Sequence, residues 1–233
     1  MMHLRFTSVS LILLLAFSSL ATGQQAIDLG PSIVNPDSRS PIDNPLFPVD
    51  DGERQILEAL QQARKGPRYA NVSVTDGRLL RLLTEAIGAQ RVVEIGTSTG
   101  ESGLWFALGL RKTGGHLITH EIHPGRAKIA EENFRRAGVE HLITIVLGDA
   151  HETVMDLEGP IDILFLDADK DNYLDYLDKL VPKIRPGGLI IAHNMVSPPP
   201  DPKYIEAITQ NPAFETSFLL MDAAGISVTL KKR

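Results

Sequence analysis

The sequence contains no cysteine. This absence excludes disulfide bonds, thiolate metal sites, cysteine nucleophiles and a lipoprotein anchor. The chain also lacks an excess of basic residues, because 23 lysines and arginines stand against 29 aspartates and glutamates, for a formal net charge of -6. A protein that binds nucleic acid carries a basic surface. We therefore expect no nucleic-acid partner.

A long apolar run is also missing, and the N-terminal run is too short to span a bilayer comfortably. Arg5 precedes this run, residues 9–17, and the small residues Ala21 and Gly23 follow it. This pattern predicts a signal peptide over residues 1–23, with cleavage after Gly23. We expect an exported protein, periplasmic or secreted. Retention of the segment as a membrane anchor is the second possibility.

Prolines at 31, 36, 41, 45 and 48 interrupt residues 24–50. Because proline fixes φ and removes a donor, this segment is expected to be an extended or disordered linker. Residues 51–233 are expected to form one domain that opens with helices over 52–64 and 75–87. After these helices, strands are expected at 91–95, 115–121, 143–147, 161–166 and 188–192, with further helices at 101–110, 124–137 and 172–184.

This alternation predicts an α/β fold, a Rossmann-like and mostly parallel sheet with helices on both faces. Segments 218–221 and 226–230 break the pattern and predict a closing hairpin. The turn after the first strand carries glycines at 96, 100 and 103. Such a turn lets backbone approach a ligand, but the spacing departs from G-x-G-x-x-G and so disfavours a dinucleotide. Glu94, at its entrance, suits a cationic or hydroxyl-bearing ligand.

Acidic residues end the next two strands as well. Glu121 can accept both hydroxyls of a ribose, and Asp149 can accept from an adenine amino group. The backbone N–H of Ala150 can donate to a ring nitrogen. A single acid at a strand end is usually a helix cap. Several of them beside one glycine turn predict a nucleoside site.

Five segments, VVEIGTSTGESGLWFALGL, HEIHP, GDA, FLDADKDNYLDYLDKL and IRPGGLIIAHN, closely resemble the caffeoyl-CoA and catechol O-methyltransferase family over residues 70–233. The resemblance implies a seven-stranded sheet whose last strand is antiparallel, with S-adenosylmethionine and a divalent metal as cofactors. The cofactor contacts that it implies are Val72, Glu94, Gly96, Thr97, Ser102, Glu121, Ala150 and Asp169. The implied metal ligands are Asp167, His193 and Asn194, and the implied base is Lys170.

The chemistry of methyl transfer fits these roles. The sulfonium methyl group is already electrophilic, so the enzyme supplies alignment and a deprotonated oxygen. A phenol has a pKa near ~10, which a divalent cation lowers when it binds the oxygen. Asp167 is then expected to bind the metal, Lys170 to accept the proton, and Asp169 to face the cofactor. Asp171 is expected to cap the following helix.

The sequence departs from the family pattern at position 193, where the family has an acid and this chain has His193. An imidazole ligand favours zinc, iron, manganese or another transition metal over magnesium or calcium. The first hypothesis is therefore a methyltransferase that prefers a transition metal. The second is a site without metal in which His193 is the base.

The expected acceptor segment, 195–204, is short and holds four prolines. We find no cluster of lysines or arginines for the phosphates of a CoA ester, so a small catechol-like acceptor is preferred. An exported, non-catalytic nucleoside- or metal-binding protein is the alternative function, because S-adenosylmethionine is as a rule cytosolic. Members of the family commonly dimerise, so the resemblance implies a homodimer.

Overall fold

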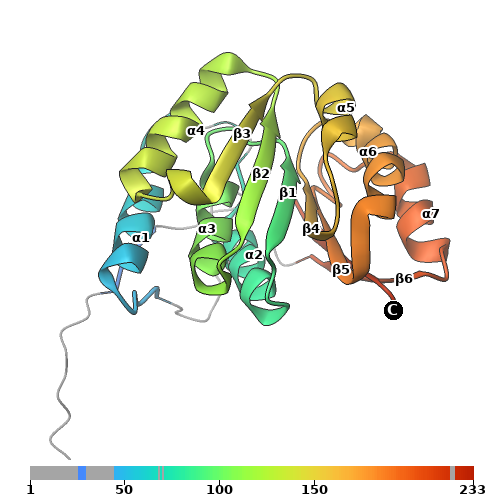
Figure 1. Ribbon diagram of the computed structural model, residues 1–233, viewed down its shortest axis with the longest axis horizontal. Helices are drawn as coiled ribbons and strands as arrows, with labels where there is room; N and C mark the ends of the chain where they lie inside the picture. Colours follow the sequence, from blue (N-terminus) through green and yellow to red (C-terminus); the bar gives the residue numbers. More distant parts are fainter. Residues whose placement is uncertain (1–25, 30–44, 68, 70, 221–223) are drawn as a thin grey trace, which may run out of the picture.

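A computed structural model describes residues 26–29, 45–67, 69, 71–220 and 224–233 (Figure 1). The predicted signal peptide and the prolines at 31, 36 and 41 lie outside the described residues. Within the described ranges, no helix is both long and apolar enough to cross a membrane.

A seven-stranded sheet in the order β3-β2-β1-β4-β5-β7-β6 forms the centre of the molecule. Its strands are β1 Arg91–Ile95, β2 His116–Glu121, β3 Ile143–Leu147, β4 Ile161–Leu166, β5 Ile184–His193, β6 Phe214–Leu219 and β7 Ile226–Lys231. Strands β1 to β5 pair in parallel, whereas β7 is antiparallel to both of its neighbours. The predicted Rossmann-like sheet with an antiparallel last strand is confirmed.

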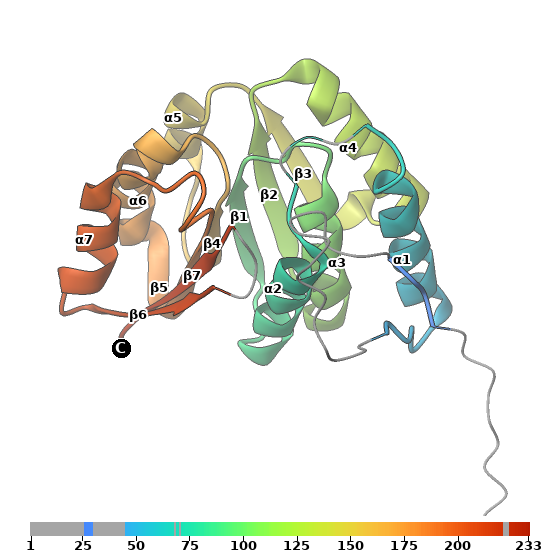
Figure 2. The same ribbon diagram turned by 180° about the vertical axis from the view of Figure 1, so that it is seen from behind.

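Helices cover both faces of the sheet, with α1 to α4 on one side and α5 to α7 on the other (Figures 1 and 2). They are α1 Asp51–Ala63, α2 Val74–Ala86, α3 Glu101–Thr113, α4 Pro124–Ala137, α5 Ala150–Thr153, α6 Tyr173–Leu180 and α7 Pro202–Gln210. The described residues also form the 3-10 turns η1 Glu140–Leu142, η2 Val154–Asp156, η3 Lys170–Asn172 and η4 Val181–Lys183.

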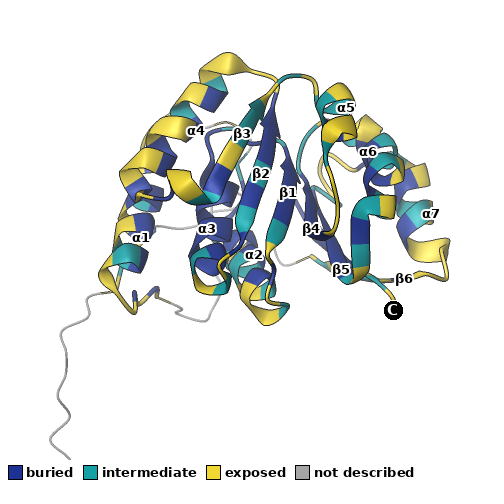
Figure 3. Cartoon of the chain, viewed as in Figure 1, coloured by how far each residue is buried: buried dark blue, intermediate teal, exposed yellow. Residues whose placement is uncertain are grey.

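The two faces divide the apolar core between them. Phe165 joins the cluster under α1 to α4, while its neighbours Leu164 and Leu166 join the cluster under α6 and α7. Because side chains alternate along a strand, a strand covered on both faces is apolar at every position. All of β4 is accordingly buried, as Figure 3 shows for the central strands. Because β1 to β5 are parallel, their carboxyl ends lie along the same edge of the sheet.

Several boundaries differ from the predicted ones. Helix α6 ends at Leu180 instead of 184, and a 3-10 turn that contains Pro182 follows it. Proline has no N–H for an interior helical bond, which explains the early end. Strand β5 begins at Ile184 instead of 188, with a register irregularity against β4 between Ile161 and Ile163. Strand β6 begins at Phe214 instead of 218.

The described parts of the predicted linker pack against the domain. Ile27 and Leu46 form an antiparallel bridge in which the Ile27 N–H donates to the Leu46 carbonyl at 2.9 Å. Leu29 and Leu46 are each only 7% exposed. Arg64, which follows α1, donates from Nε to the Leu29 carbonyl at 3.1 Å. Ile27, Leu29 and Leu46 thus pack against the apolar cluster that includes the buried side of α1.

Candidate active site

The glycine turn lies against the end of β4. Gly96 has φ +106, and a Cβ built there would stand 2.4 Å from the carbonyl oxygen of Asp167. The Asp167 N–H donates to the Ile95 carbonyl at 2.9 Å. Only glycine fits this approach, because its neighbour is backbone that cannot turn away. The turn and the aspartate-rich segment are therefore one structural unit, as the sequence predicts.

Glu94 is fully buried beneath the turn. The hydroxyl groups of Ser102 and Thr119 donate to its two carboxylate oxygens. Thr97 is also inside, with its Oγ1 2.6 Å from the Oγ1 of Thr119. Burial raises the pKa of Glu94 to about 7, and the charges of Asp167 and Glu121 act in the same direction. A cationic ligand at this edge would stabilise the charged carboxylate.

Replacing Glu94 with glutamine is expected to change how stability depends on pH. In the wild type, folded Glu94 holds its proton between about 4.5 and about 7, whereas the unfolded chain has lost it. Stability from this group is therefore highest below pH 4.5 and falls as pH rises toward 7. The loss is on the order of 3 kcal/mol. Urea unfolding at pH 5 and pH 8 measures it.

Glu94→Gln should lose this part of the pH dependence, and the exposed control Glu131→Gln should keep it. Comparing the three proteins removes the contributions of all other titrating groups, since those are shared. An unchanged difference between pH 5 and pH 8 in Glu94→Gln would contradict the assignment.

Glu121 joins the glycine turn to the segment after β2. Its Oε2 accepts from the Ser98 N–H at 2.7 Å, and its Oε1 accepts from the His123 N–H at 2.9 Å. Each carboxylate oxygen keeps a further lone pair, so the two predicted ribose hydroxyls can still bind. The next residue, Ile122, is 66% exposed and places an apolar side chain on the surface beside Glu121. Ile122 was not predicted from the sequence, because only the folded chain shows that its side chain is exposed.

Val72 differs from the other predicted contacts because its side chain belongs to the core and is 1% exposed. Its neighbour Asn71 holds the turn: Asn71 Nδ2 donates to Thr99 Oγ1 and to Glu101 Oε1, each at 2.8 Å. Ser98 Oγ donates to Asn71 Oδ1 at 2.9 Å. Val72 thus marks the segment that supports the turn, while Asn71 makes the polar contacts.

A separate cluster of polar side chains surrounds Asp169. Tyr176 donates from its hydroxyl to Asp169 Oδ1 at 2.8 Å and stacks on the ring of His151 at 4.5 Å. Asp149 accepts from the His151 N–H at 2.9 Å and so caps the helix that begins at Ala150. The predicted residues 149, 150 and 169 are therefore linked through His151 and Tyr176.

The predicted base, Lys170, lies just beyond the end of β4. Lys170 Nζ lies 2.9 Å from Asp167 Oδ1 and 2.7 Å from the hydroxyl of Tyr173. Tyr173 donates that hydroxyl to the Leu166 carbonyl at 2.9 Å. The cap expected at Asp171 is not formed, because this residue lies within the 3-10 turn and the next residue precedes α6. Lys170 is thus held by two partners at the sheet edge.

His193, the last residue of β5, lies between two carboxylates. Its Nδ1 is 3.3 Å from Asp167 Oδ1, and its Nε2 is 3.1 Å from Asp76 Oδ2. Burial opposes a charge on the imidazole, but Asp167 and Asp76 outweigh it and raise the pKa of His193 to about 10. Burial likewise opposes the charge on Asp167, and His193 and Lys170 outweigh it and lower that pKa. Asp76 is a site residue that we did not predict.

The side chains predicted to bind a metal ion are not arranged for that purpose in the folded chain. A metal-binding imidazole needs a free lone pair, but both ring nitrogens of His193 face carboxylates. Asn194 Nδ2 donates to the Ser197 carbonyl at 2.7 Å, a contact that leaves its Oδ1 unused, so the misfit lies at His193. In the part of the chain that the structure describes, no group of three or more acidic or histidine side chains is arranged for a metal ion.

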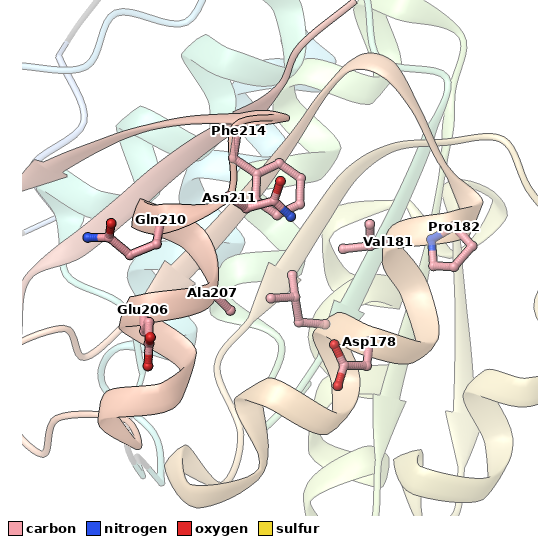
Figure 4. A pocket seen from close by; sticks show the side chains of 9 residues that line it. Asp178, Val181, Pro182, Glu206, Ala207, Gln210, Asn211 and Phe214 are labelled. Carbon is pink, nitrogen blue, oxygen red and sulfur yellow. The ribbon is translucent and has the colours of Figure 1, made fainter.

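A hollow of about 340 Å³ lies elsewhere, between α6, α7 and the start of β6 (Figure 4). Leu177, Val181 and Phe214 line it together with Asp178 and Glu206. None of the residues predicted for the site contributes to its wall. The predicted site residues therefore lie apart from this hollow.

Comparison with known proteins places this geometry in a family. The family profile described as O-methyltransferase matches residues 49–198. Catechol O-methyltransferase from Mycobacterium tuberculosis is 38% identical over 148 residues, covering 63% of this chain and 66% of that protein. Caffeoyl-CoA O-methyltransferase 2 from Zea mays is 38% identical over 155 residues, covering 64% of this chain and 58% of that protein. The chain thus spans about two thirds or less of these relatives.

Solved structures agree with the sequence relatives. An O-methyltransferase from Bacillus cereus in complex with SAH has a TM-score of 0.68 and 28% identity, covering 80% of this chain and 93% of that chain. An O-methyltransferase from Streptomyces achromogenes in complex with SAM has a TM-score of 0.67 and 26% identity, with 79% and 91% covered. The chain therefore belongs to the O-methyltransferase family, and the prediction of an S-adenosylmethionine-dependent O-methyltransferase is confirmed at the level of the family.

Proposed function

We propose that this chain transfers the methyl group of S-adenosylmethionine to a hydroxyl of a small catechol-like acceptor. The observation that carries the proposal is Lys170, held by Asp167 and Tyr173 beside the glycine turn. A neutral amine has two N–H groups and one lone pair. If the two partners take both N–H groups, the lone pair is left for the proton of the acceptor hydroxyl.

The cofactor side of the proposal rests on the carboxylates at the same edge. Glu121 suits the ribose hydroxyls, and buried Glu94 adds negative potential where the ligand carries its sulfonium and ammonium charges. Fixing donor and acceptor in line removes much of the entropic barrier to displacement. The acceptor class is supported by the similarity to proteins named catechol O-methyltransferase. The non-catalytic alternative finds no support in the comparisons.

Transfer of label from S-adenosylmethionine tests this function. The full-length protein is incubated with methyl-labelled cofactor and either catechol or 1,2-dimethoxybenzene, which has no free hydroxyl. Label should enter catechol as a methyl ether and should not enter the dimethoxy compound. Bound cofactor without label in catechol would contradict the acceptor class, and label in both compounds would contradict transfer to a hydroxyl.

Two further proposals come from the sequence. The N-terminal pattern supports export with cleavage after Gly23, and the family resemblance supports a homodimer. N-terminal sequencing of the exported protein tests the first, since the chain should then begin at Gln24. Light scattering of the purified protein tests the second.

A further inference from the structure

The side chain of His193 is fixed from both sides. Its partners Asp76 and Asp167 approach opposite ring nitrogens, and all three side chains are only 7% exposed. Ionised carboxylates accept hydrogen bonds and cannot donate them, so each ring nitrogen that faces one has to carry a hydrogen. The geometry is that of a buried imidazolium between two anions.

Asp76 is itself positioned by the start of α2. Ser73 Oγ donates to Asp76 Oδ2 at 3.0 Å, and the Asp76 N–H donates to Ser73 Oγ at 3.0 Å. On the other side, Asp167 Oδ1 is within 2.9 Å of Lys170 Nζ. We call the four side chains of Asp76, His193, Asp167 and Lys170 the charge row. Along it, anionic and cationic positions alternate, so the charges of the row balance once Lys170 has taken the proton of the acceptor.

We propose that the charge row takes the place of a divalent cation, so that methyl transfer by this chain needs no metal. His193, held by Asp76, supplies the positive charge beside Asp167 that a metal ion would otherwise supply. Asp167 is thereby fixed toward Lys170. Asp76 and His193 are positioning residues, because they act on the reaction through Asp167 and Lys170. The inference rests on the proposed function.

The step balances without a metal. The lone pair of Lys170 takes the proton of the acceptor hydroxyl as the oxygen attacks the methyl carbon. The carbon–sulfur bond breaks and its electron pair stays on sulfur. The products are a methyl ether, S-adenosylhomocysteine and protonated Lys170, which Asp167 and the Tyr173 oxygen stabilise.

Metal binding and turnover are measured separately on the full-length protein. Elemental analysis and calorimetry with magnesium, manganese and zinc report binding, and labelled transfer before and after chelation reports activity. We expect substoichiometric metal, no saturable binding heat and an unchanged rate after chelation. Stoichiometric metal whose removal abolishes transfer would overturn the inference and leave the proposed function standing. If no acceptor is methylated under any condition, the function fails, and calorimetry still decides the metal question.

Two substitutions test the row itself. Asp76→Asn should lower kcat by about 10- to 100-fold with an unchanged KM for the cofactor, since a misplacement of about 1 Å at a reacting group can cost about 10²-fold in rate. The exposed Asp178→Asn is the matched control, since it removes one charge outside the row. His193→Asp should gain saturable magnesium binding, because the introduced carboxylate would join those of Asp76 and Asp167. Wild-type kcat in Asp76→Asn, or no magnesium binding by folded His193→Asp, would contradict the role of the row.

Discussion

Replacing Lys170 with methionine is expected to lower kcat by about 10²- to 10⁴-fold, the usual contribution of a general base, while affinity for S-adenosylmethionine stays unchanged. Methionine keeps most of the side-chain length but has no basic nitrogen. The acceptor hydroxyl would then keep its proton, and a neutral phenol is a poor nucleophile. Single-turnover label transfer with saturating cofactor measures the chemical step, and calorimetry measures cofactor binding.

The exposed lysine of α4 provides the control. Lys128→Met removes the same charge from the surface and should leave both rate and affinity unchanged. If Lys170→Met keeps the wild-type kcat, the base is another group. If it loses cofactor affinity together with kcat, Lys170 acts in binding and not in proton transfer.

The sequence predicts the fold well because its main signals are local. Apolar strands that end in glycine or acid, with amphipathic helices between them, determine a parallel sheet without any long-range information. The carboxyl ends of such strands meet at one edge, so Glu94, Glu121 and Asp167 are predicted to gather there. Two of the boundaries that fail, the end of α6 and the start of β5, involve proline or a register irregularity.

The role of Asp76 as a partner of His193 could not be predicted from the sequence, for a physical reason. It lies 117 residues before His193 in the sequence, and only the folded chain brings the two together. Locally, Ser73 and Asp76 form a serine and an acid three residues apart at a helix start, which indicates capping. The structure shows that Ser73 is indeed the cap and that Asp76 also reaches His193. The capping pattern explains Asp76 locally, so its contact with His193 could not be predicted from the sequence.

The same limit applies to the metal prediction. Asp167, His193 and Asn194 have suitable residue types at suitable strand ends, and sequence alone gives no sign of competing partners. Carboxylates face both ring nitrogens of His193, so no lone pair of that imidazole is free for a metal ion. Ligand types are read from sequence, but the availability of their lone pairs is a property of the folded site.

Replacing Gly96 with alanine is expected to damage both stability and activity. Its φ of +106 is a conformation that L side chains rarely adopt, and the added Cβ would meet the Asp167 carbonyl oxygen at 2.4 Å. Strain of this kind costs about 1–3 kcal/mol, and relief of the clash requires the backbone at Asp167 to move. A displacement of about 1 Å at a reacting centre can cost about 10²-fold in rate.

Gly125 in α4 is the matched control, because nothing lies within 4 Å of its added Cβ and its φ is not positive. Gly125→Ala should equal or slightly exceed the wild type in stability, since alanine favours a helix over glycine by up to about 1 kcal/mol. Urea unfolding and label transfer compare the three proteins. A Gly96→Ala protein with wild-type stability and rate would show that the glycine turn and the Asp167 segment move independently. Loss of rate in a folded variant would show that this one backbone contact sets the position of Asp167, and with it Lys170, relative to the cofactor.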